Sequence, residues 1–257
     1  MSFLFKKKKI DENKLPKHIA FIMDGNGRWA TKRGLPRNLG HKAGADAMKK
    51  VISACYKFGI KVVTFYCFST ENWKRPDEEV KGIFSLAKEY FEKNKAQLIE
   101  KQICINALGD ISNLPCGASE VLNDVIEKTK SFSKMVVNLA VNYGGRAEIL
   151  RAVNNIVNDG IKVVDDELFK SYLYTKDLPD PDIVVRTSGE MRVSGFLIYQ
   201  LAYSEFYFTK IHWPDFDEKQ VEKVIINYQG RNRRFGGLGR REKWKKDLFL
   251  VFLLLLL

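Results

Sequence analysis

The stretch FIMDGNGRWA, residues 21–30, ends an apolar run with an acid, two glycines, an arginine and a tryptophan. The run starts at His18 and reaches Met23, and its length and composition predict a buried β-strand. Asp-Gly and Asn-Gly pairs favour the positive φ angles of turns. A tight hairpin would need a second strand at once, and the following RWATKRG is not one. A structural turn and a ligand-binding loop therefore both remain open for residues 24–29.

Strand and helix patterns alternate along the rest of the chain. We predict further strands at 61–68, 103–109, 135–143, 182–188 and 206–211, and helices at 40–58, 77–102, 118–130 and 146–158. The strands are unbroken apolar runs, which predicts a single α/β domain with a mostly parallel central sheet covered by helices. Ligands of such sheets bind beyond the carboxyl ends of the strands. Asp24, Ser69 and Arg186 all fall there.

The composition limits the number of domains, the class of partner and the kinds of metal site that we expect. The chain has 257 residues, 45% of them apolar, which is enough for one large domain with a substantial core. Its net charge of +12 predicts an anionic partner, which is a phosphorylated metabolite, nucleic acid or a membrane surface. The four cysteines lie far apart and only three histidines occur. This pattern indicates reduced thiols in a cytosolic protein and no zinc site.

Two classes of ligand fit the glycines of the first loop. Gly25, Gly27 and Ala30 match the GxGxxA fingerprint of dinucleotide sites, but Asp24 would repel a pyrophosphate, and the acid expected at the end of the second strand is missing. A diphosphate site with Mg²⁺ is the interpretation that gives Asp24 a role. The glycines expose backbone N–H groups, Arg28 binds phosphate oxygens, and Asp24 supplies a carboxylate for the ion. We therefore favour the diphosphate site.

Other segments carry more polar residues than turns require. FSTENWKRP (68–76) and VVRTSGEMRVSGF (184–196) each follow or end a buried strand. Arg37 and His41, in LPRNLGHKAG, resemble surface or helix-start residues when taken alone. Glu205 stands among aromatic residues, where an acid usually has a cation partner. We predict that these segments join the first loop and add a second anion site.

Seven motifs together resemble the cis-prenyltransferase family, most closely its bacterial isoprenyl transferases (undecaprenyl diphosphate synthases). They are HIAFIMDGNGRWA, GHKAG, FSTENWKRP, VNYGGR, RTSGE, FYFTKIHWPDF and RNRRFGG, and they occur in the family's order. The resemblance implies the cis-prenyltransferase fold with an apolar channel, and a catalytic domain at 18–238. It does not cover a basic N-terminal arm at 1–17 or a tail at 239–257 that is basic and then Leu-rich.

The resemblance implies a Mg²⁺-dependent transferase that extends an allylic diphosphate, such as farnesyl diphosphate, with isopentenyl diphosphate in cis configuration. Asp24 and Asn72 would be catalytic, and Asp24 and Glu205 would bind Mg²⁺. Asn72 matches the family's proton acceptor, but an amide is a weak base, so a phosphate oxygen is the alternative acceptor. The residues that would bind the two substrates are Gly25, Asn26, Gly27, Arg28, Trp29, Arg37, His41, Ser69, Thr70, Glu71, Trp73, Arg75, Arg186, Arg192, Val193 and Ser194.

Two departures from the family pattern bear on activity. Met191 stands where some members carry a metal-contacting His, and Gly195 follows Ser194 where Asn is usual. A non-catalytic partner subunit of the family should lack the Asp24 loop, which this chain retains. A basic nucleic-acid-binding protein would also fit the charge, but no RRM, KH or helix-turn-helix signature is present. We expect an active enzyme and no nucleic-acid partner.

The resemblance also implies a homodimer, with residues 230–237 near an active site, the chain's own or its neighbour's. Residues 248–257 are ten apolar residues, about 15 Å of helix, too short for a hydrocarbon core of about 30 Å. Trp244 among lysines suits a lipid headgroup boundary. The expected location is cytoplasmic, with a peripheral contact at the inner face of the membrane. A disordered tail is the alternative.

Overall fold

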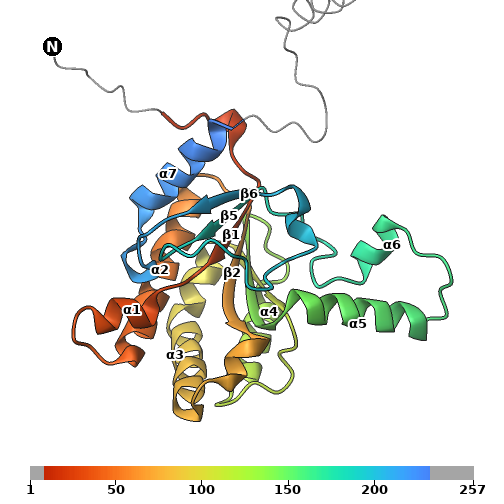
Figure 1. Ribbon diagram of the computed structural model, residues 1–257, viewed down its shortest axis with the longest axis horizontal. Coiled ribbons are helices and arrows are strands. Elements are labelled where there is room, and N and C mark those ends of the chain that lie inside the picture. The colour runs from red at the N-terminus through yellow and green to blue at the C-terminus, as the bar shows by residue number, and fades with distance from the viewer. Residues whose placement is uncertain (1–8, 232–257) are drawn as a thin grey trace, which may run out of the picture.

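A six-stranded, all-parallel sheet forms the centre of the computed structural model, which describes residues 9–231 (Figure 1). The strand order is β3-β4-β2-β1-β5-β6. The strands are β1 (His18–Ile22), β2 (Val62–Ser69), β3 (Ile103–Leu108), β4 (Met135–Tyr143), β5 (Ile183–Arg186) and β6 (Glu205–Phe208). The predicted single α/β domain with a mostly parallel sheet is confirmed. β1 lies between β2 and β5. The loop that follows β1, which contains Asp24, therefore starts near the middle of the sheet edge.

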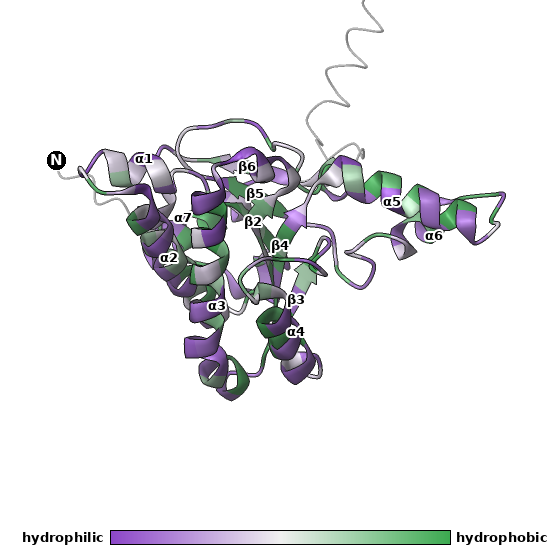
Figure 2. Ribbon diagram, turned by 90° about the horizontal axis from the view of Figure 1, so that it is seen from below, coloured by the Kyte–Doolittle hydropathy of each residue, from purple (hydrophilic) through white to green (hydrophobic). Residues whose placement is uncertain are grey.

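Helices cover one face of the sheet, and the segment with Phe196, Leu197 and Leu201 packs on the other. Figure 2 shows α2, α3 and α7 on one side, whereas α5 and α6 form an arm that extends away on the other. The helices are α1 (Asn26–Thr31), α2 (Arg37–Lys57), α3 (Asp77–Glu100), α4 (Ala118–Thr129), α5 (Gly145–Asn158), α6 (Asp166–Ser171) and α7 (Glu218–Gln229). Short 3₁₀ turns are η1 (Glu12–Lys14), η2 (Thr70–Lys74), η3 (Gln200–Tyr203) and η4 (Trp213–Asp215). Within 9–231, no helix combines the length and the apolar character of a membrane span.

The predicted elements between residues 18 and 158 are confirmed, with ends that differ by a few residues. The largest shift is at α2, which begins at Arg37 directly after Pro36 instead of at residue 40. Leu39 in its first turn is exposed, so this turn lacks the apolar face that periodicity detects. We did not predict α7, although Asp217 caps it by accepting from the N–H of Gln220. Its buried Val221, Val224 and Ile225 have the expected helical spacing.

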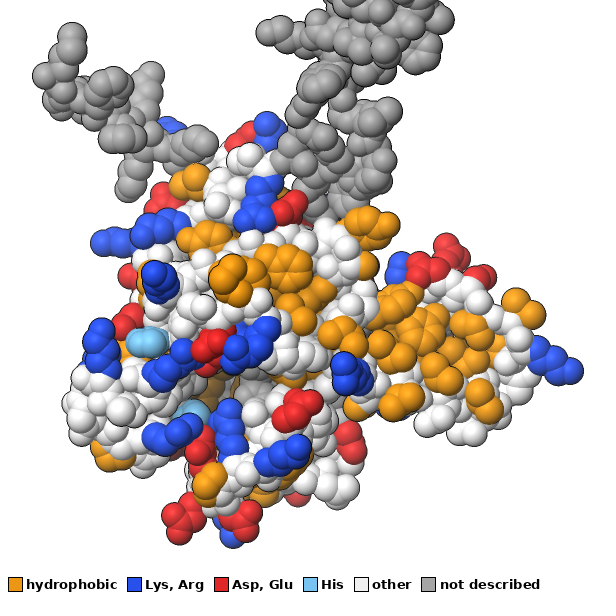
Figure 3. All heavy atoms as spheres, in the orientation of Figure 1, with side chains coloured by type: hydrophobic (Ala, Val, Ile, Leu, Met, Phe, Trp, Pro, Cys, Tyr) orange, Lys and Arg blue, Asp and Glu red, His pale blue; other side chains and the backbone are white. Residues whose placement is uncertain are grey.

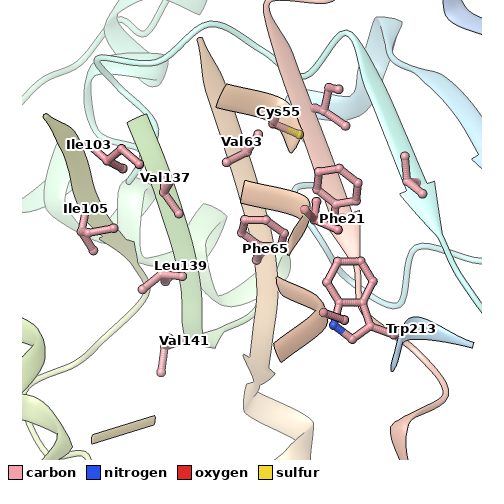
Figure 4. Close-up of a cluster of buried hydrophobic side chains, with 14 of the residues drawn as sticks. Phe21, Cys55, Val63, Phe65, Ile103, Ile105, Val137, Leu139, Val141 and Trp213 are labelled. Carbon is pink, nitrogen blue, oxygen red and sulfur yellow. The ribbon is translucent and has the colours of Figure 1, made fainter. Parts of the chain in front are cut away.

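The main core lies between the sheet and helices α2, α3, α4 and α7. Figure 4 shows Phe21 of β1, Phe65 of β2 and Trp213 of η4 pointing toward one another. The Phe21 and Phe65 rings stack with centroids 5.2 Å apart. Trp213 is fully buried, and its indole N–H donates to the carbonyl of Gly44 in α2 at 2.8 Å. This core therefore fixes η4 against both β1 and α2.

The described part of the N-terminal arm packs onto the domain. The backbone N–H of Asp11 donates to Oε1 of Gln229 in α7 at 3.1 Å, and Nε2 of Gln229 donates back to the Asp11 carbonyl at 2.7 Å. Ile10 and Leu15 contact the main core. Residues 1–8 and the tail at 239–257 lie outside the described residues.

A buried polar row crosses four strands on the other face of the sheet. His18 Nδ1 donates to the carbonyl of Pro179, and its Nε2 lies 2.7 Å from the Thr64 hydroxyl. Asn138 Nδ2 donates to that hydroxyl at 3.0 Å, and Asn106 Nδ2 donates to Asn138 Oδ1 at 3.3 Å. Burial outweighs the Pro179 carbonyl and the charge of Asp182, and lowers the pKa of His18 to about 4. His18 is therefore neutral in the folded protein at neutral pH.

This burial predicts a pH dependence of stability. The folded pKa of His18 lies below the ordinary value of 6.5, so the unfolded chain binds a proton that the folded chain excludes. The free energy of unfolding should fall as pH drops from about 6.5 toward 4, by on the order of 3 kcal/mol from this group. Urea unfolding of the wild type and His18→Gln across this range measures it. An unchanged pH slope in the variant would contradict the assignment.

Candidate functional site

A cleft of about 640 Å³ opens where the loops after β1, β2 and β5 meet. Asp24, Ser69 and Arg186 all line it, as their positions after parallel strands predict. Figure 3 shows basic side chains, mixed with acidic ones, gathered at the lower left around this part of the surface. The other lining residues are Ile22, Met23, Gly25, Asn26, Gly27, Arg28, Thr31, Lys32, Arg37, His41, Tyr66, Cys67, Asn72, Arg75, Ile83 and Ser194.

Asp24 lies between two arginines. Its Oδ1 is 2.9 Å from Nη2 of Arg28, and its Oδ2 is 3.0 Å from Nη2 of Arg186. Partial burial opposes ionisation of Asp24, but the hydrogen bonds and charges of Arg186 and Arg28 outweigh it and hold the pKa of this carboxyl below its ordinary range. Asp24 is therefore a stable carboxylate at neutral pH, in a setting that is otherwise cationic.

The backbone of Asp24 is held as firmly as its side chain. Its carbonyl accepts from Oγ1 of Thr187 at 2.6 Å, from Oγ of Ser188 at 2.9 Å and from the N–H of Trp213 at 3.1 Å. Nδ1 of His212 lies 2.7 Å from the Ser188 hydroxyl. We did not predict a role for these residues. Their only signal is that they fall inside the RTSGE and FYFTKIHWPDF motifs.

Gly25 is required by this packing. Its φ is +104°, and a Cβ added to it would lie 1.8 Å from Oγ of Ser188 and 2.8 Å from Nδ1 of His212. Gly27 is covered by the guanidinium of Arg37, whose Cζ would be 3.2 Å from an added Cβ. The glycines of the loop therefore allow close approach of polar groups, as the sequence indicated.

The turn after β2 contributes only some of its predicted residues to the cleft. Ser69, Asn72 and Arg75 line it. Oδ1 of Asn72 accepts from the N–H of Ser69 at 3.0 Å, so this oxygen is used in capping η2. The indole N–H of Trp73 donates instead to Asn142 at 2.8 Å, and its ring stacks on Phe84. Thr70 packs close to Gly144, and Glu71 is exposed.

Trp29 is also directed elsewhere. Its indole N–H donates to Oδ1 of Asp215 at 2.7 Å, and the guanidinium of Arg33 lies 4.2 Å from its ring centroid. These contacts join α1 to η4. We expected Trp29 to bind substrate, and that role stays a prediction.

A second cationic group lies beyond β5. Arg186 is buried, and its Nη1 donates to the carbonyl of Arg192 and to Oγ of Ser194 at 2.9 Å. The Arg192 side chain pairs with Glu190 and is largely exposed, while Val193 packs on the smaller core. Ser194 has a φ of +48° and Gly195 a φ of +76°. Gly and Asn both tolerate such angles, so the departure at Gly195 suits this backbone.

Two buried polar atoms at the cleft hydrogen bond to nothing within the described residues. They are Nε of Arg186 and Oδ1 of Asn26. Buried polar groups are usually satisfied, so each is a place where a ligand or water would gain a hydrogen bond. The N–H donor of Arg186 suits a phosphate oxygen.

Glu205 and Asp24 are not brought together within one chain. Glu205 is the first residue of β6, and sheet register places it level with Ile183 and Ile19. Asp24 lies five residues beyond Ile19, roughly 16 Å along the strand direction. Oε2 of Glu205 is 2.5 Å from Nη1 of Arg231. Among residues 9–231 no group of three or more His, Cys, Asp or Glu side chains could share a metal ion.

An apolar passage leads from the cleft between α2, α3 and the sheet. A cavity of about 140 Å³ shares Met23, Asn26, His41, Cys67 and Ile83 with the cleft. A third cavity of about 40 Å³ continues it and shares Met48, Tyr90, Phe91 and Leu139. These three spaces adjoin one another through shared lining residues, and they lie where the predicted apolar channel would run. The side chains of α3 that line its second cavity are Ile83, Leu86, Ala87, Tyr90 and Phe91.

Sequence comparisons place this chain among known enzymes. Residues 22–236 match the Prenyltransf family model, whose description is "Putative undecaprenyl diphosphate synthase". The isoprenyl transferase of Clostridium tetani is 48% identical over 235 residues, which cover 89% of this chain and 92% of that protein. The isoprenyl transferase of Clostridium acetobutylicum is 49% identical over 238 residues, which cover 89% of this chain and 93% of that protein.

Solved structures agree with the sequence matches. Lavandulyl diphosphate synthase from Lavandula x intermedia, in complex with dimethylallyl diphosphate, is 32% identical with a TM-score of 0.83, and the match covers 87% of this chain and 99% of that one. A probable undecaprenyl diphosphate synthase from Campylobacter jejuni is also 32% identical, with a TM-score of 0.72, and the match covers 86% of this chain and 98% of that one.

The packing around Gly25 generates a prediction. Gly25→Ala should displace Ser188 or the Asp24 backbone and weaken binding of inorganic diphosphate by roughly tenfold, the loss of about 1.4 kcal/mol. Isothermal titration calorimetry measures the affinity. Gly34→Ala is the matched control, because Gly34 also has a positive φ but an added Cβ there meets nothing within 4 Å. Equal affinities in the two variants would show that the contact with Ser188 is unimportant.

Proposed function

The chain belongs to the family of undecaprenyl diphosphate synthases, and from this premise we propose how its own residues carry out the reaction. Its activity is prenyl transfer: it condenses isopentenyl diphosphate with an allylic diphosphate in cis configuration and so extends a polyprenyl diphosphate. The observation that carries the proposal is the position of Asp24, between Arg28 and Arg186 at the mouth of an apolar channel.

The allylic substrate binds with its diphosphate in the cleft and its prenyl chain in the channel. The diphosphate contacts the backbone of residues 25–27 and the side chains of Arg28, Arg37, His41 and Arg75. This placement is supported by the cationic lining of the cleft and by the channel that begins beside it. An apolar chain gains free energy by leaving water for such a channel.

Isopentenyl diphosphate binds on the β5 side, at Arg186, Ser194 and Arg192. The unpaired Nε of Arg186 supports this assignment, because it is a buried donor with no partner in the described chain. Arg192 lies at the exposed edge, where it is free to exchange Glu190 for a phosphate oxygen. The two diphosphates then flank Asp24.

The donor set at the cleft fits Mg²⁺. This ion typically takes one or two carboxylates, with phosphate oxygens and water completing its coordination. Asp24 supplies one carboxylate beside the proposed diphosphates, and Glu205 stays a predicted ligand that the fold of one chain does not support. When bound, Mg²⁺ would neutralise charge on the departing diphosphate.

The reaction requires charge stabilisation more than it requires a strong base. Cleavage of the allylic C–O bond releases a diphosphate anion, which Arg28, Arg37 and Arg75 stabilise as it forms. The isopentenyl double bond attacks the allylic cation, and one proton is then lost. Because Oδ1 of Asn72 already accepts from Ser69, we assign the proton to an oxygen of the released diphosphate and give Asn72 a positioning role.

The Asp24 assignment has a direct test. Asp24→Ala should lower turnover by roughly a hundredfold to a thousandfold, because it removes the carboxylate that would hold Mg²⁺ beside the departing diphosphate. It should leave binding of the allylic substrate largely intact, because the arginines remain. The assay uses labelled isopentenyl diphosphate, farnesyl diphosphate and Mg²⁺, with chromatography of the products. Asp159→Ala, at the end of α5, is the control. Near-normal turnover by folded Asp24→Ala would refute the mechanism.

We assign the arm formed by α5 and α6 to a homodimer interface. Its exposed apolar residues are Leu150, Val153, Val157, Val163 and Val164. The first three recur at helical spacing on α5, and Figure 3 shows an apolar area over this arm. Contiguous exposed apolar surface of this kind typically marks an interface, and a second copy of the chain fits the family. Residues 232–237, which the resemblance places near an active site, lie outside the described residues.

The interface predicts a change in molecular mass. Replacing both Leu150 and Val157 with Glu should convert a dimer to a monomer, because buried unpaired charges oppose association. Light scattering after size exclusion measures the mass. Ile99→Glu on α3 is the control, since Ile99 is apolar and exposed but lies away from the arm. A monomeric wild type, or a dimeric double variant, would contradict the assignment.

We place the enzyme in the cytoplasm with a peripheral contact at the inner face of the membrane. The four cysteines are all free thiols, which suits a reducing compartment. The membrane contact rests on the Leu-rich tail at 248–257, which lies outside the described residues.

A further inference from the structure

One carboxylate contacts two arginines and a histidine of the proposed allylic site. Oε1 of Glu79, in the first turn of α3, lies 3.2 Å from Nη1 of Arg75, 3.3 Å from Nε2 of His41 and 3.5 Å from Nη2 of Arg37. Two of these partners belong to α2, and Arg75 precedes α3. Glu79 was not among the residues that we predicted from the sequence. The contact therefore assigns an additional acid to the site.

Glu79 contacts Arg37, His41 and Arg75 but does not itself line the cleft. Those three partners line the cleft that contains Asp24. Glu79 lines a neighbouring groove between the starts of α2 and α3, which Arg37 and His41 also line. Its side chain is only 16% exposed. Each arginine has five N–H donors, so a contact to one shared oxygen leaves others for phosphate. A diphosphate can therefore bind without displacing Glu79.

Two guanidinium groups this close together need an anion beside them, and the Nε2 of His41 lies within reach of the same carboxylate. Without that anion, the mutual repulsion of the guanidinium groups would favour conformations in which the side chains spread into solvent. Arg37 is the most exposed of the three, yet its guanidinium is held over Gly27 of the first loop. This arrangement presents the cations toward the cleft before substrate arrives, which reduces the ordering that binding requires.

Glu79 also connects the cleft to the channel. One helical turn after it, Ile83 of the same helix lines both the cleft and the adjoining cavity. The next residues of α3 along this face, Leu86, Ala87 and Tyr90, line the cavity further on. A shift of α3 would therefore move the cations and the channel wall together.

We propose that Glu79 is a positioning residue for prenyl transfer, which holds Arg37, His41 and Arg75 as a preassembled diphosphate site and fixes that site to the channel helix α3. This inference rests on the proposed allylic site. It differs from a competitive role, in which the carboxylate would occupy the place of the diphosphate and its removal would tighten binding.

The test compares two neighbouring acids. Glu79→Gln keeps the size of the side chain and removes the charge, and the KM for the allylic diphosphate should rise roughly tenfold, the effect of losing a partner that orients binding groups. The KM for isopentenyl diphosphate and kcat should change little, because Asp24 and Arg186 are untouched. Glu78→Gln, in the same turn and with the same change of charge, is the matched control and should behave as wild type. Glu79→Asp, which keeps the charge, should lie between.

A spectroscopic measurement separates positioning from general damage. Burial lowers the pKa of His41, and Glu79 opposes this effect, while Arg75 and Arg37 add to it. Removing the Glu79 charge should therefore lower the pKa of His41 further. NMR titration of the His41 ring, identified with a His41→Gln variant, measures the shift in the folded protein. Glu78→Gln should leave this pKa unchanged.

Each outcome has a defined meaning. Tighter binding of the allylic diphosphate by Glu79→Gln would overturn positioning in favour of competition. Equal behaviour of Glu78→Gln and Glu79→Gln would overturn the inference as well. If Arg37→Ala and Arg75→Ala raise the allylic KM but Glu79→Gln does not, the proposed function stands and the inference about Glu79 fails. If the two arginine variants also leave that KM unchanged, the proposed allylic site itself is wrong.

Discussion

A buried guanidinium needs an anion beside it, and in this fold that need fixes the centre of the cleft. Arg186 ends β5 with a side chain that is only 5% exposed, so its charge would be costly without Asp24. Sheet register places Arg186 beside Ile22 of β1, two residues before Asp24. The pair therefore joins the two loops that divide the proposed substrates. The same contact keeps Asp24 ionised, which a carboxylate facing Mg²⁺ and diphosphate requires.

Local patterns were sufficient to predict most of the fold. Unbroken apolar runs such as KVVTFYCF predict parallel strands because such strands are buried on both faces, and β2 is one. Parallel strands also bring their carboxyl ends to one edge, so the meeting of Asp24, Ser69 and Arg186 could be predicted without coordinates. The glycines around Asp24 indicated that other groups approach the loop backbone closely, and the Ser188 hydroxyl does so at Gly25. These features depend on residues that are near one another in sequence or on a rule of sheet topology.

The features that we did not predict depend on side-chain direction across distant segments. Trp29 stays a predicted substrate contact, but its hydrogen bond to Asp215, 186 residues away, could not be predicted. Glu205 stands among aromatic residues, a setting that predicts a cation partner, but only the fold shows that this partner is Arg231. Ser188 had no signal beyond its place in the RTSGE motif, and Glu79 had none, because a serine in a turn and an acid in the first turn of a helix are both ordinary. Only the folded chain shows what each one touches.

The apolar lining of the channel has a consequence for movement. Each condensation inserts new carbons between the diphosphate and the existing chain, so the chain must slide away from the cleft by one unit. Dispersion contacts are worth about 0.1–0.2 kcal/mol per atom pair and have no directional register. Met23, Met48 and Cys67 add soft, adaptable surfaces along the way. Sliding therefore exchanges one set of contacts for an equivalent set, and a low barrier to translocation favours repeated additions before the product leaves.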